Sequence, residues 1–216
     1  MNSQFIAQME RVLWLYALSF DEKYPVVCFD ERPCMLLGEV VEPLPLKKGQ
    51  VRKEHCTYER HGSCALLAAI EPLTGKRLGF VSAQRTKKEY TQFCQILAAA
   101  YPNAKKIRLV QDNLNTHNIS SFYEHLSPTE AFALAQRFEF YYTPKAASWL
   151  NMIEIEFSAL ARQGLNRRIP TIDIVKREVL SLLRQRDKKK IKINWQFSIQ
   201  SARTKMKSHY CKIRAV

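Results

Sequence analysis

Apolar residues at the start of the chain recur at the spacing of an amphipathic helix. The stripe predicts a leading helix that ends before Tyr24 and Pro25, with an apolar face that packs on a core. The positions of the stripe are Phe5, Ile6, Met9, Val12, Leu13 and Tyr16. A short, continuously apolar run follows, Val26 to Phe29, which is typical of a strand buried on both faces. We expect this strand to end on Asp30 and Glu31.

Two further apolar runs flank a turn. Residues 63–70 and 77–82 lie on either side of Pro72-Leu73-Thr74-Gly75, which predicts a β-hairpin. The stretch before them, residues 38–55, contains two prolines, Gly49 and several charged residues, so we expect an exposed loop or arm there. The first strands are therefore expected to be sequential and antiparallel.

Helical and strand patterns alternate through the rest of the chain. Thr86 and Glu89 have the spacing of a capping box, which predicts the start of a helix that reaches Ala100. The later elements that we expect are a strand at 107–111, a helix at 128–138, a strand at 139–142, a helix that Ser148 caps, a helix at 171–186 and a last basic helix at 198–211. This order indicates an α/β fold, a mixed sheet with helices on both faces.

Carboxylates follow two of the predicted strands. The strand from Ile107 stops on Asp112, and an Asp-Asn pair favours a chain break. Such an aspartate is commonly a turn residue, but this edge of an open α/β sheet also holds ligands because the loops diverge there. Asp30 would lie beside Asp112 if the first and fourth strands are neighbours.

A third carboxylate is available from the helix that starts near Ser148. Glu154 and Glu156 lie about 200° apart around a helix axis, so they cannot both face one site, and periodicity does not decide between them. Three carboxylates on separate rigid elements match what a pair of hard divalent cations needs, with positions left for water and phosphate oxygens. Such a site suits hydrolysis and transfer of phosphodiesters.

The positive charge of the chain is concentrated toward its C-terminal end. The formal net charge is +14, and residues 159–216 hold 16 basic and 3 acidic residues, a net of +13. A localised positive field of this size is typical of a protein that binds a polyanion, nucleic acid first. A basic surface kept for solubility is the alternative.

Composition argues against several other classes of protein. A hydrophobic fraction of 46% and an aromatic fraction of 11% are typical of a globular protein rather than a disordered one. The chain has no signal peptide and no apolar run near the ~18 residues of a membrane span, so we expect a cytoplasmic protein without a membrane partner. Its six cysteines lack zinc-ligand spacing with the histidines, which favours reduced thiols.

Three motifs resemble those of a known family. They are Val-Val-Cys-Phe-Asp30-Glu31, Val-Gln-Asp112-Asn-Leu-Asn-Thr-His117 and Tyr-Thr-Pro-Lys-Ala-Ala-Ser-Trp-Leu-Asn151-Met-Ile-Glu154. In this order they are similar to the transposases of the insertion-sequence 630 type, in the Tc1/mariner superfamily, from about Pro25 to the C-terminal end. The resemblance implies a ribonuclease-H-like, retroviral-integrase fold and a catalytic, metal-binding triad of Asp30, Asp112 and Glu154, so it selects Glu154 over Glu156. It also implies two Mg²⁺ or Mn²⁺ ions and DNA strand cleavage followed by strand transfer.

Other residues are candidates for supporting roles. Glu31, His117 and Asn151 are candidates to orient the ligating carboxylates through hydrogen bonds, with capping or packing as the alternative for His117. Trp149 is a candidate surface on which an unpaired base could stack, with core packing as its alternative. The candidate phosphate contacts, with a solvated surface charge as the alternative for each, are Arg162, Arg167, Arg168, Lys188, Lys189 and Lys190.

The resemblance implies DNA as the partner, both transposon ends and target, and we expect a homodimer on DNA at the bacterial nucleoid. We divide the chain into a leading helix (1–24), a catalytic domain (25–186) and a basic extension (187–216). Members of the family usually carry helix-turn-helix modules ahead of the catalytic domain, and Asp30 lies too near Met1 to leave room for them. The alternatives are therefore a non-catalytic DNA-binding or regulatory remnant and a structure-selective nuclease on the same fold.

Overall fold

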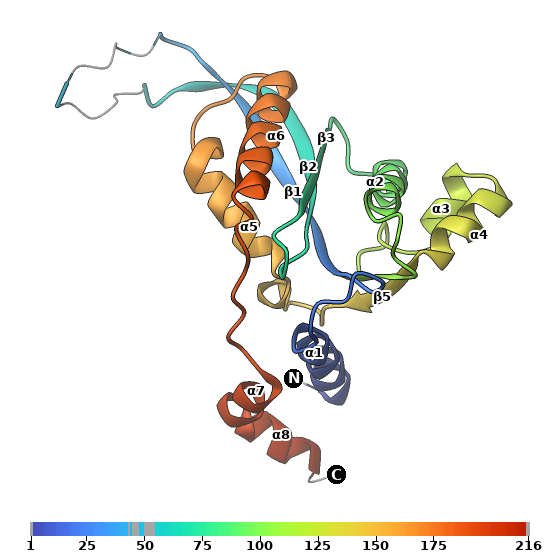
Figure 1. Ribbon diagram of the computed structural model, residues 1–216. Coiled ribbons are helices and arrows are strands. Elements are labelled where there is room, and N and C mark those ends of the chain that lie inside the picture. The colour runs from blue at the N-terminus through green and yellow to red at the C-terminus, as the bar shows by residue number, and fades with distance from the viewer. Residues whose placement is uncertain (1, 43, 45–47, 50–54, 215–216) are drawn as a thin grey trace.

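A five-stranded sheet with the order β3-β2-β1-β4-β5 forms the centre of the protein (Figure 1). The computed structural model describes residues 2–42, 44, 48–49 and 55–214. The strands are β1 (Val26–Glu39), β2 (Tyr58–Ile70), β3 (Arg77–Ser82), β4 (Ile107–Gln111) and β5 (Phe138–Tyr142). The first three strands pair antiparallel, whereas β4 runs parallel to β1 and β5 runs parallel to β4. The predicted mixed sheet and its early hairpin are confirmed.

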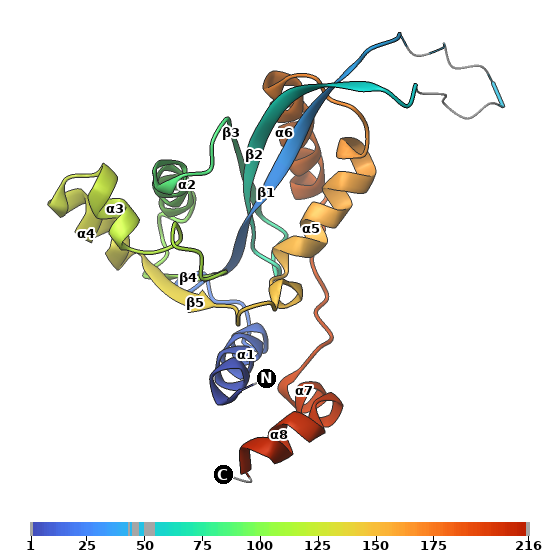
Figure 2. The same ribbon diagram turned by 180° about the vertical axis from the view of Figure 1, so that it is seen from behind.

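Helices cover both faces of this sheet (Figures 1 and 2). One side holds α1 (Ser3–Tyr16), α5 (Ile153–Leu160) and α6 (Ile172–Lys188), and the other holds α2 (Lys87–Ala100), α3 (Ser120–His125) and α4 (Pro128–Gln136). Two short helical segments flank α5, a 3₁₀ turn η1 (Ser148–Leu150) and a π-helical turn η2 (Ala161–Leu165). The C-terminal helices α7 (Ile199–Lys205) and α8 (Lys207–Arg214) lie beside α1. No helix within the described ranges is both long and apolar enough to cross a membrane.

The two faces of the sheet bury separate hydrophobic clusters. Side chains alternate along β1, so Cys28 points into the cluster built with α1, α5 and α6, while Val27 and Phe29 point into the cluster built with α2. Met9 of α1 and Ala202 of α7 belong to the first cluster. The leading helix and the start of the C-terminal region therefore share a core with the sheet.

The prediction that β1 ends on Asp30 was wrong. β1 continues to Glu39 because β2 pairs with it as far as Glu39 and Tyr58, with one irregularity after Met35. The parallel pairing of β1 with β4, however, stops at Cys28 and Val110. Asp30 therefore lies inside a strand, but at the point where its parallel neighbour has ended.

Several predicted helix boundaries also differ. The capping box of Thr86 and Glu89 is present as predicted. Ser148 does not cap α5, because it begins the separate turn η1 and α5 starts only at Ile153. The last basic helix is interrupted at Met206, and α3 was not predicted. Of the expected arm at 38–55, residues 43, 45–47 and 50–54 lie outside the described residues.

Candidate active site

Three carboxylates from separate elements lie near the edge of the sheet where β4 ends. Val27 and Cys28 of β1 lie opposite Leu109 and Val110 of β4, and the same register two residues later brings Asp30 opposite Asp112. Glu154 is the second residue of α5, which packs on the same side of the sheet as Asp30. The neighbouring-strand arrangement expected for the two aspartates is therefore present.

The pKa of Asp30 reports how close these groups are. The pKa of this carboxyl is raised from its ordinary value to about 7, mainly by burial; the nearby charges of Asp112 and Glu154 also raise it, and a hydrogen bond from the Glu31 amide lowers it. That amide lies 2.7 Å from Asp30 Oδ1. Negative charge therefore accumulates here at an energetic cost that a bound cation would relieve.

The two aspartates line an open cleft of about 670 Å³. The β5–η1 loop contributes residues 143–148, among them the exposed Lys145 and Ser148. Ala146 in this loop has a φ of 60°, a left-handed conformation that costs an ordinary residue about 1–2 kcal/mol. The first two turns of α1 complete the lining. The cleft gives a substrate direct access to the carboxylates.

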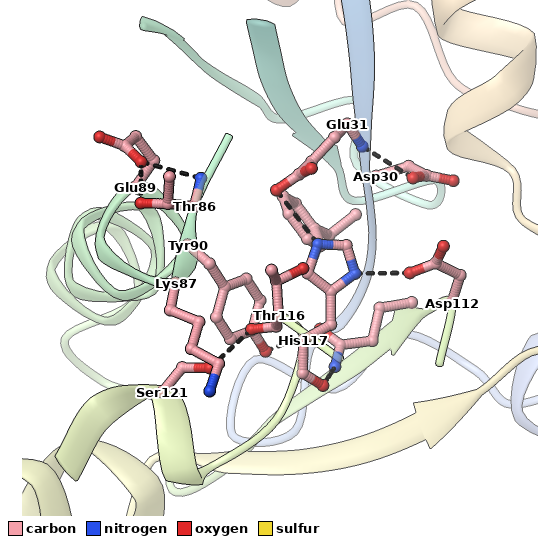
Figure 3. A network of polar contacts seen from close by, with 12 residues as sticks. Asp30, Glu31, Thr86, Lys87, Glu89, Tyr90, Asp112, Thr116, His117 and Ser121 are labelled. Carbon is pink, nitrogen blue, oxygen red and sulfur yellow. Dashed lines mark hydrogen bonds and ion pairs between the residues drawn. The ribbon is translucent and has the colours of Figure 1, made fainter. Parts of the chain in front are cut away.

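His117 joins Asp112 to Glu31 (Figure 3). The imidazole is fully buried, its Nδ1 lies 2.5 Å from Asp112 Oδ1, and its Nε2 lies 3.1 Å from Glu31 Oε1. Burial lowers the pKa of His117, but the two carboxylates outweigh burial and raise the pKa to about 9. The ring packs against Tyr90 and Phe29, with centroids 4.9 and 5.2 Å away. A protonated His117 thus donates to Asp112 from a fixed position.

The backbone of His117 is held as firmly as its ring. Gln111 Nε2 donates to the carbonyl of His117 over 2.8 Å, and the Tyr90 hydroxyl donates to Gln111 Oε1 over 2.9 Å. Gln111 is fully buried and directly precedes Asp112. This hydrogen-bonded chain fixes the segment from Asp112 to His117 against α2.

The two glutamates of α5 have different surroundings. Glu156 is fully buried and accepts two hydrogen bonds from Arg186 of α6, at 2.7 and 3.0 Å. Arg77 Nε of β3 lies 2.9 Å from Glu156 Oε1. Glu154 is half-buried and close enough to Asp30 to raise its pKa. Glu156 therefore joins α5 to α6 and β3, whereas Glu154 is the glutamate of α5 that lies near Asp30, although it is not among the residues that line the cleft.

Asn151 connects the start of α5 to β1. Its buried amide donates to the carbonyl of Phe29 over 2.8 Å, and its own carbonyl accepts from the amide of Glu154 over 3.1 Å. Phe29 directly precedes Asp30. Asn151 thus couples the position of Glu154 to the position of Asp30.

The three carboxylates do not form a closed binding site for a single ion. Among the described residues, no three His, Cys, Asp or Glu side chains stand together as a ready site for one ion. Asp112 Oδ1 is engaged by His117, which leaves Oδ2 as its free ligand atom. Mg²⁺ is commonly bound through only one or two carboxylates together with water and substrate phosphates. The donor set therefore fits hard divalent cations that the substrate helps to bind.

The candidate phosphate contacts are not equivalent. Arg168 is engaged inside the protein by Glu39 and by the carbonyls of His55 and Thr57. Arg167 pairs with Glu178 over 3.2 Å on the surface. Arg162, Lys188, Lys189 and Lys190 are exposed. Trp149 is 44% exposed and packs against Phe197 in a T-shaped arrangement, so the predicted core packing accounts for only part of its surface.

Sequence reasoning missed the contribution of α1 to the cleft. Gln4, Phe5 and Gln8 of this helix and its N-cap residue Asn2 line the cleft together with Asp30 and Asp112. The apolar stripe of α1 predicted its buried face correctly, since Met9, Val12 and Leu13 are at most 2% exposed. Its polar face could not be assigned to the cleft from the sequence, because polar residues have the same helical spacing whether they line a cleft or face bulk solvent.

Solved structures with the same fold include those of a mariner transposase. The Mos1 mariner paired-end complex with Mn matches with a TM-score of 0.57 and 12% identity, over 88% of this chain and 59% of that chain. The Mos1 strand transfer complex matches with a TM-score of 0.56 and 13% identity, over 87% and 56%. The chain thus spans less than two thirds of the length of these relatives. These matches confirm the ribonuclease-H-like fold.

A family model for the DDE superfamily endonucleases matches residues 25–176, which hold all three carboxylates. No curated protein sequence matches the chain. The matched range covers well over half of the chain and runs from the start of β1 into α6. The motifs, the fold and the family model agree, so the chain belongs to the DDE superfamily endonucleases, and the resemblance to Tc1/mariner-type catalytic domains is confirmed.

Proposed function

We propose that this chain is a DNA transposase catalytic domain that cleaves a DNA strand and transfers the freed 3′ end to target DNA. Asp30, Asp112 and Glu154 are the proposed catalytic residues and hold two Mg²⁺ or Mn²⁺ ions. The observation that carries the proposal is that Asp30 and Asp112 line one open cleft, with Glu154 near enough to contribute to the raised pKa of Asp30. Buried like charges in an open cleft are typical of a functional site rather than of a stabilising one.

The chemistry of the site follows from its ligands. Divalent ions, when bound, lower the pKa of an attacking water and stabilise the oxygen that leaves. The protein contributes rigid placement of carboxylate oxygens on β1, after β4 and on α5. The cleft lining includes the hydroxyls of Thr143 and Ser148 and the amine of Lys145, but the proposed reaction needs no side-chain nucleophile.

Three neighbouring residues act on the carboxylates and not on the substrate. His117 donates to Asp112 Oδ1 and directs the remaining oxygen of Asp112 toward the cleft. Glu31 compensates the charge of the imidazolium from the other side. Asn151 keeps the first turn of α5 in register with β1. Residues of this kind commonly change metal affinity or activity by about 10–100-fold when they are removed.

DNA is the proposed substrate and partner, as transposon end and as target. The excess of basic residues after position 158 supports this proposal, as does the DNA-complexed state of the Mos1 structures. Arg162 and Lys188 to Lys190 are the proposed phosphate contacts, since they are exposed. We further propose a homodimer on DNA, in analogy to the paired-end complexes of Mos1.

The test is cleavage of DNA by the purified chain with Mg²⁺ or Mn²⁺. Wild type should nick DNA, and Asp112→Ala should abolish nicking while DNA affinity is retained. Asp173→Ala, at an exposed aspartate in the first turn of α6, is the matched control and should nick normally.

The products separate the alternative functions. Equal residual nicking by wild type and Asp112→Ala would indicate a contaminant and support a non-catalytic DNA-binding remnant. Nicking without joined strands, in an assay that supplies a pre-cleaved 3′ end and target DNA, would support a structure-selective nuclease on the same fold.

A further inference from the structure

Helix α1 is held rigidly next to the carboxylates. Its inner face is part of the hydrophobic core, where Met9 and Leu15 have no exposed surface. The Asn2 side chain caps its first turn by accepting from the amide of Phe5 over 2.9 Å. On its outer side, Glu10 accepts two hydrogen bonds from Arg203 of α7, at 2.8 and 3.0 Å. The helix is therefore a fixed wall of the cleft.

Two amide side chains lie on the cleft-lining face of this wall. Gln4 and Gln8 are four residues apart, so they lie one turn above the other on one face of α1, and both line the cleft with Asp30 and Asp112. Gln4 is exposed and Gln8 is half-buried. Neither amide makes a side-chain hydrogen bond to another residue in the described part of the chain. Both can therefore donate to a bound substrate.

The neutral character of this face suits a polyanion. No residue from Asn2 to Met9 carries a charge. A lysine here could pair with Asp30 or Asp112 and compete for the oxygens that bind cations, whereas a glutamate would repel phosphate. An amide donates a hydrogen bond to a phosphate oxygen without either effect.

We propose that α1 is a DNA-binding wall of the cleft, where Gln4 and Gln8 donate hydrogen bonds to the backbone of the DNA strand beside the reacting phosphate. The inference rests on the proposed function, because it names a surface that positions the same substrate. It extends the site beyond the matched family range, which begins at residue 25. A strand that reaches Asp30 and Asp112 through this cleft passes the amides.

The experiment measures binding of a fluorescent DNA duplex by anisotropy in Ca²⁺, and cleavage of the same duplex in Mg²⁺. Removing a neutral hydrogen bond should weaken DNA binding by roughly 2- to 12-fold for each of Gln4→Ala and Gln8→Ala. The loss should be similar for different DNA sequences and should leave the salt dependence of binding unchanged, because no charge is removed. Gln8→Glu should weaken binding more than Gln8→Ala.

Gln92, an exposed residue of α2 on the other side of the sheet, supplies matched controls. Gln92→Ala and Gln92→Glu should bind and cleave DNA as wild type does, and thermal unfolding should show that all variants are folded. If the Gln4→Ala, Gln8→Ala double variant binds DNA with the same affinity as the Gln92→Ala control, the assignment of α1 is overturned, even if wild type cleaves DNA. If wild type fails to cleave DNA but the double variant binds DNA more weakly than wild type, the proposed reaction is overturned and the DNA-binding role of α1 is supported. Absence of DNA binding by wild type would overturn both.

Discussion

Exchanging each glutamate of α5 for glutamine should separate stability from catalysis. Glu156→Gln should destabilise the fold, because it leaves the guanidinium groups of Arg77 and Arg186 beside a neutral side chain in the interior. Glu154→Gln should leave the fold intact and abolish DNA cleavage, because it removes a carboxylate that lies near Asp30. The two substitutions are chemically identical and lie two residues apart.

The burial of the ion pair sets the size of the effect. The side chains of Arg77 and Glu156 are 0% and 1% exposed, so solvent cannot screen the unpaired charge. Breaking a buried pair on one side costs about 3–5 kcal/mol of unfolding free energy. For a chain of this length, roughly 2–4 °C of melting temperature corresponds to each kcal/mol, so the melting temperature should fall by about 6–20 °C.

The assay compares three glutamine variants by urea unfolding and thermal melting. Glu178→Gln is the matched control, because Glu178 pairs with Arg167 on the surface, where both side chains are about a third exposed. Its loss should cost at most about 1 kcal/mol. Cleavage is then measured well below the melting temperature of every variant.

Two results would refute this reasoning. A stability of Glu156→Gln equal to that of Glu178→Gln would mean that the buried pair contributes little. Loss of cleavage in a stable Glu156→Gln variant, together with normal cleavage by Glu154→Gln, would mean that the roles of the two α5 carboxylates are reversed.

Three further predictions concern other parts of the molecule. His117→Ala should lower the cleavage rate by about 10–100-fold at fixed Mg²⁺ with DNA affinity unchanged, since the ring orients Asp112; equal rates would remove it from the site. Replacing Lys188 to Lys190 by glutamine should flatten the slope of log affinity against log salt by up to about 0.9 for each phosphate that these lysines neutralise, and an unchanged slope would exclude this patch. The hydrogen bond from Arg203 lowers the pKa of Glu10 against the effect of burial. The ion pair between α1 and α7 should therefore stabilise the protein fully above the ordinary carboxyl pKa, and this stabilisation should weaken as pH falls through the lowered pKa of Glu10. The measurement is hydrogen exchange of the α7 amides, which should become faster at low pH. Glu10→Gln should produce the same faster exchange at neutral pH.

Local signals in the sequence predicted most of the fold. The Pro-Gly turn between two apolar runs predicted the β2–β3 hairpin, and the spacing of Thr86 and Glu89 predicted the start of α2. These signals are readable because each depends on residues close together in the chain. The proximity of Asp30 and Asp112 followed from one topological assumption, that the first and fourth strands are neighbours.

Features that depend on distant residues could not be predicted in this way. Asp30 lies inside a strand because β2 continues to pair with β1 beyond it, which no pattern around Asp30 reveals. The role of Glu156 depends on Arg77, whose position against α5 exists only in the folded sheet. Arg168 resembled a surface charge in the sequence, yet Glu39 and two carbonyl groups engage it.

The alternation of side chains along β1 places the supports of the candidate active site in two different cores. Asp112 depends, through His117, on the Tyr90 and Phe29 side of the sheet, whereas Glu154 depends on the side of α5 and α6. A genetic screen for inactive alleles should therefore recover lesions scattered through both interiors rather than gathered at the cleft. The stability losses of alleles from opposite interiors should add, because the two hydrophobic clusters share no residue, whereas their losses of cleavage should not add, because the carboxylates are proposed to act on the same ions.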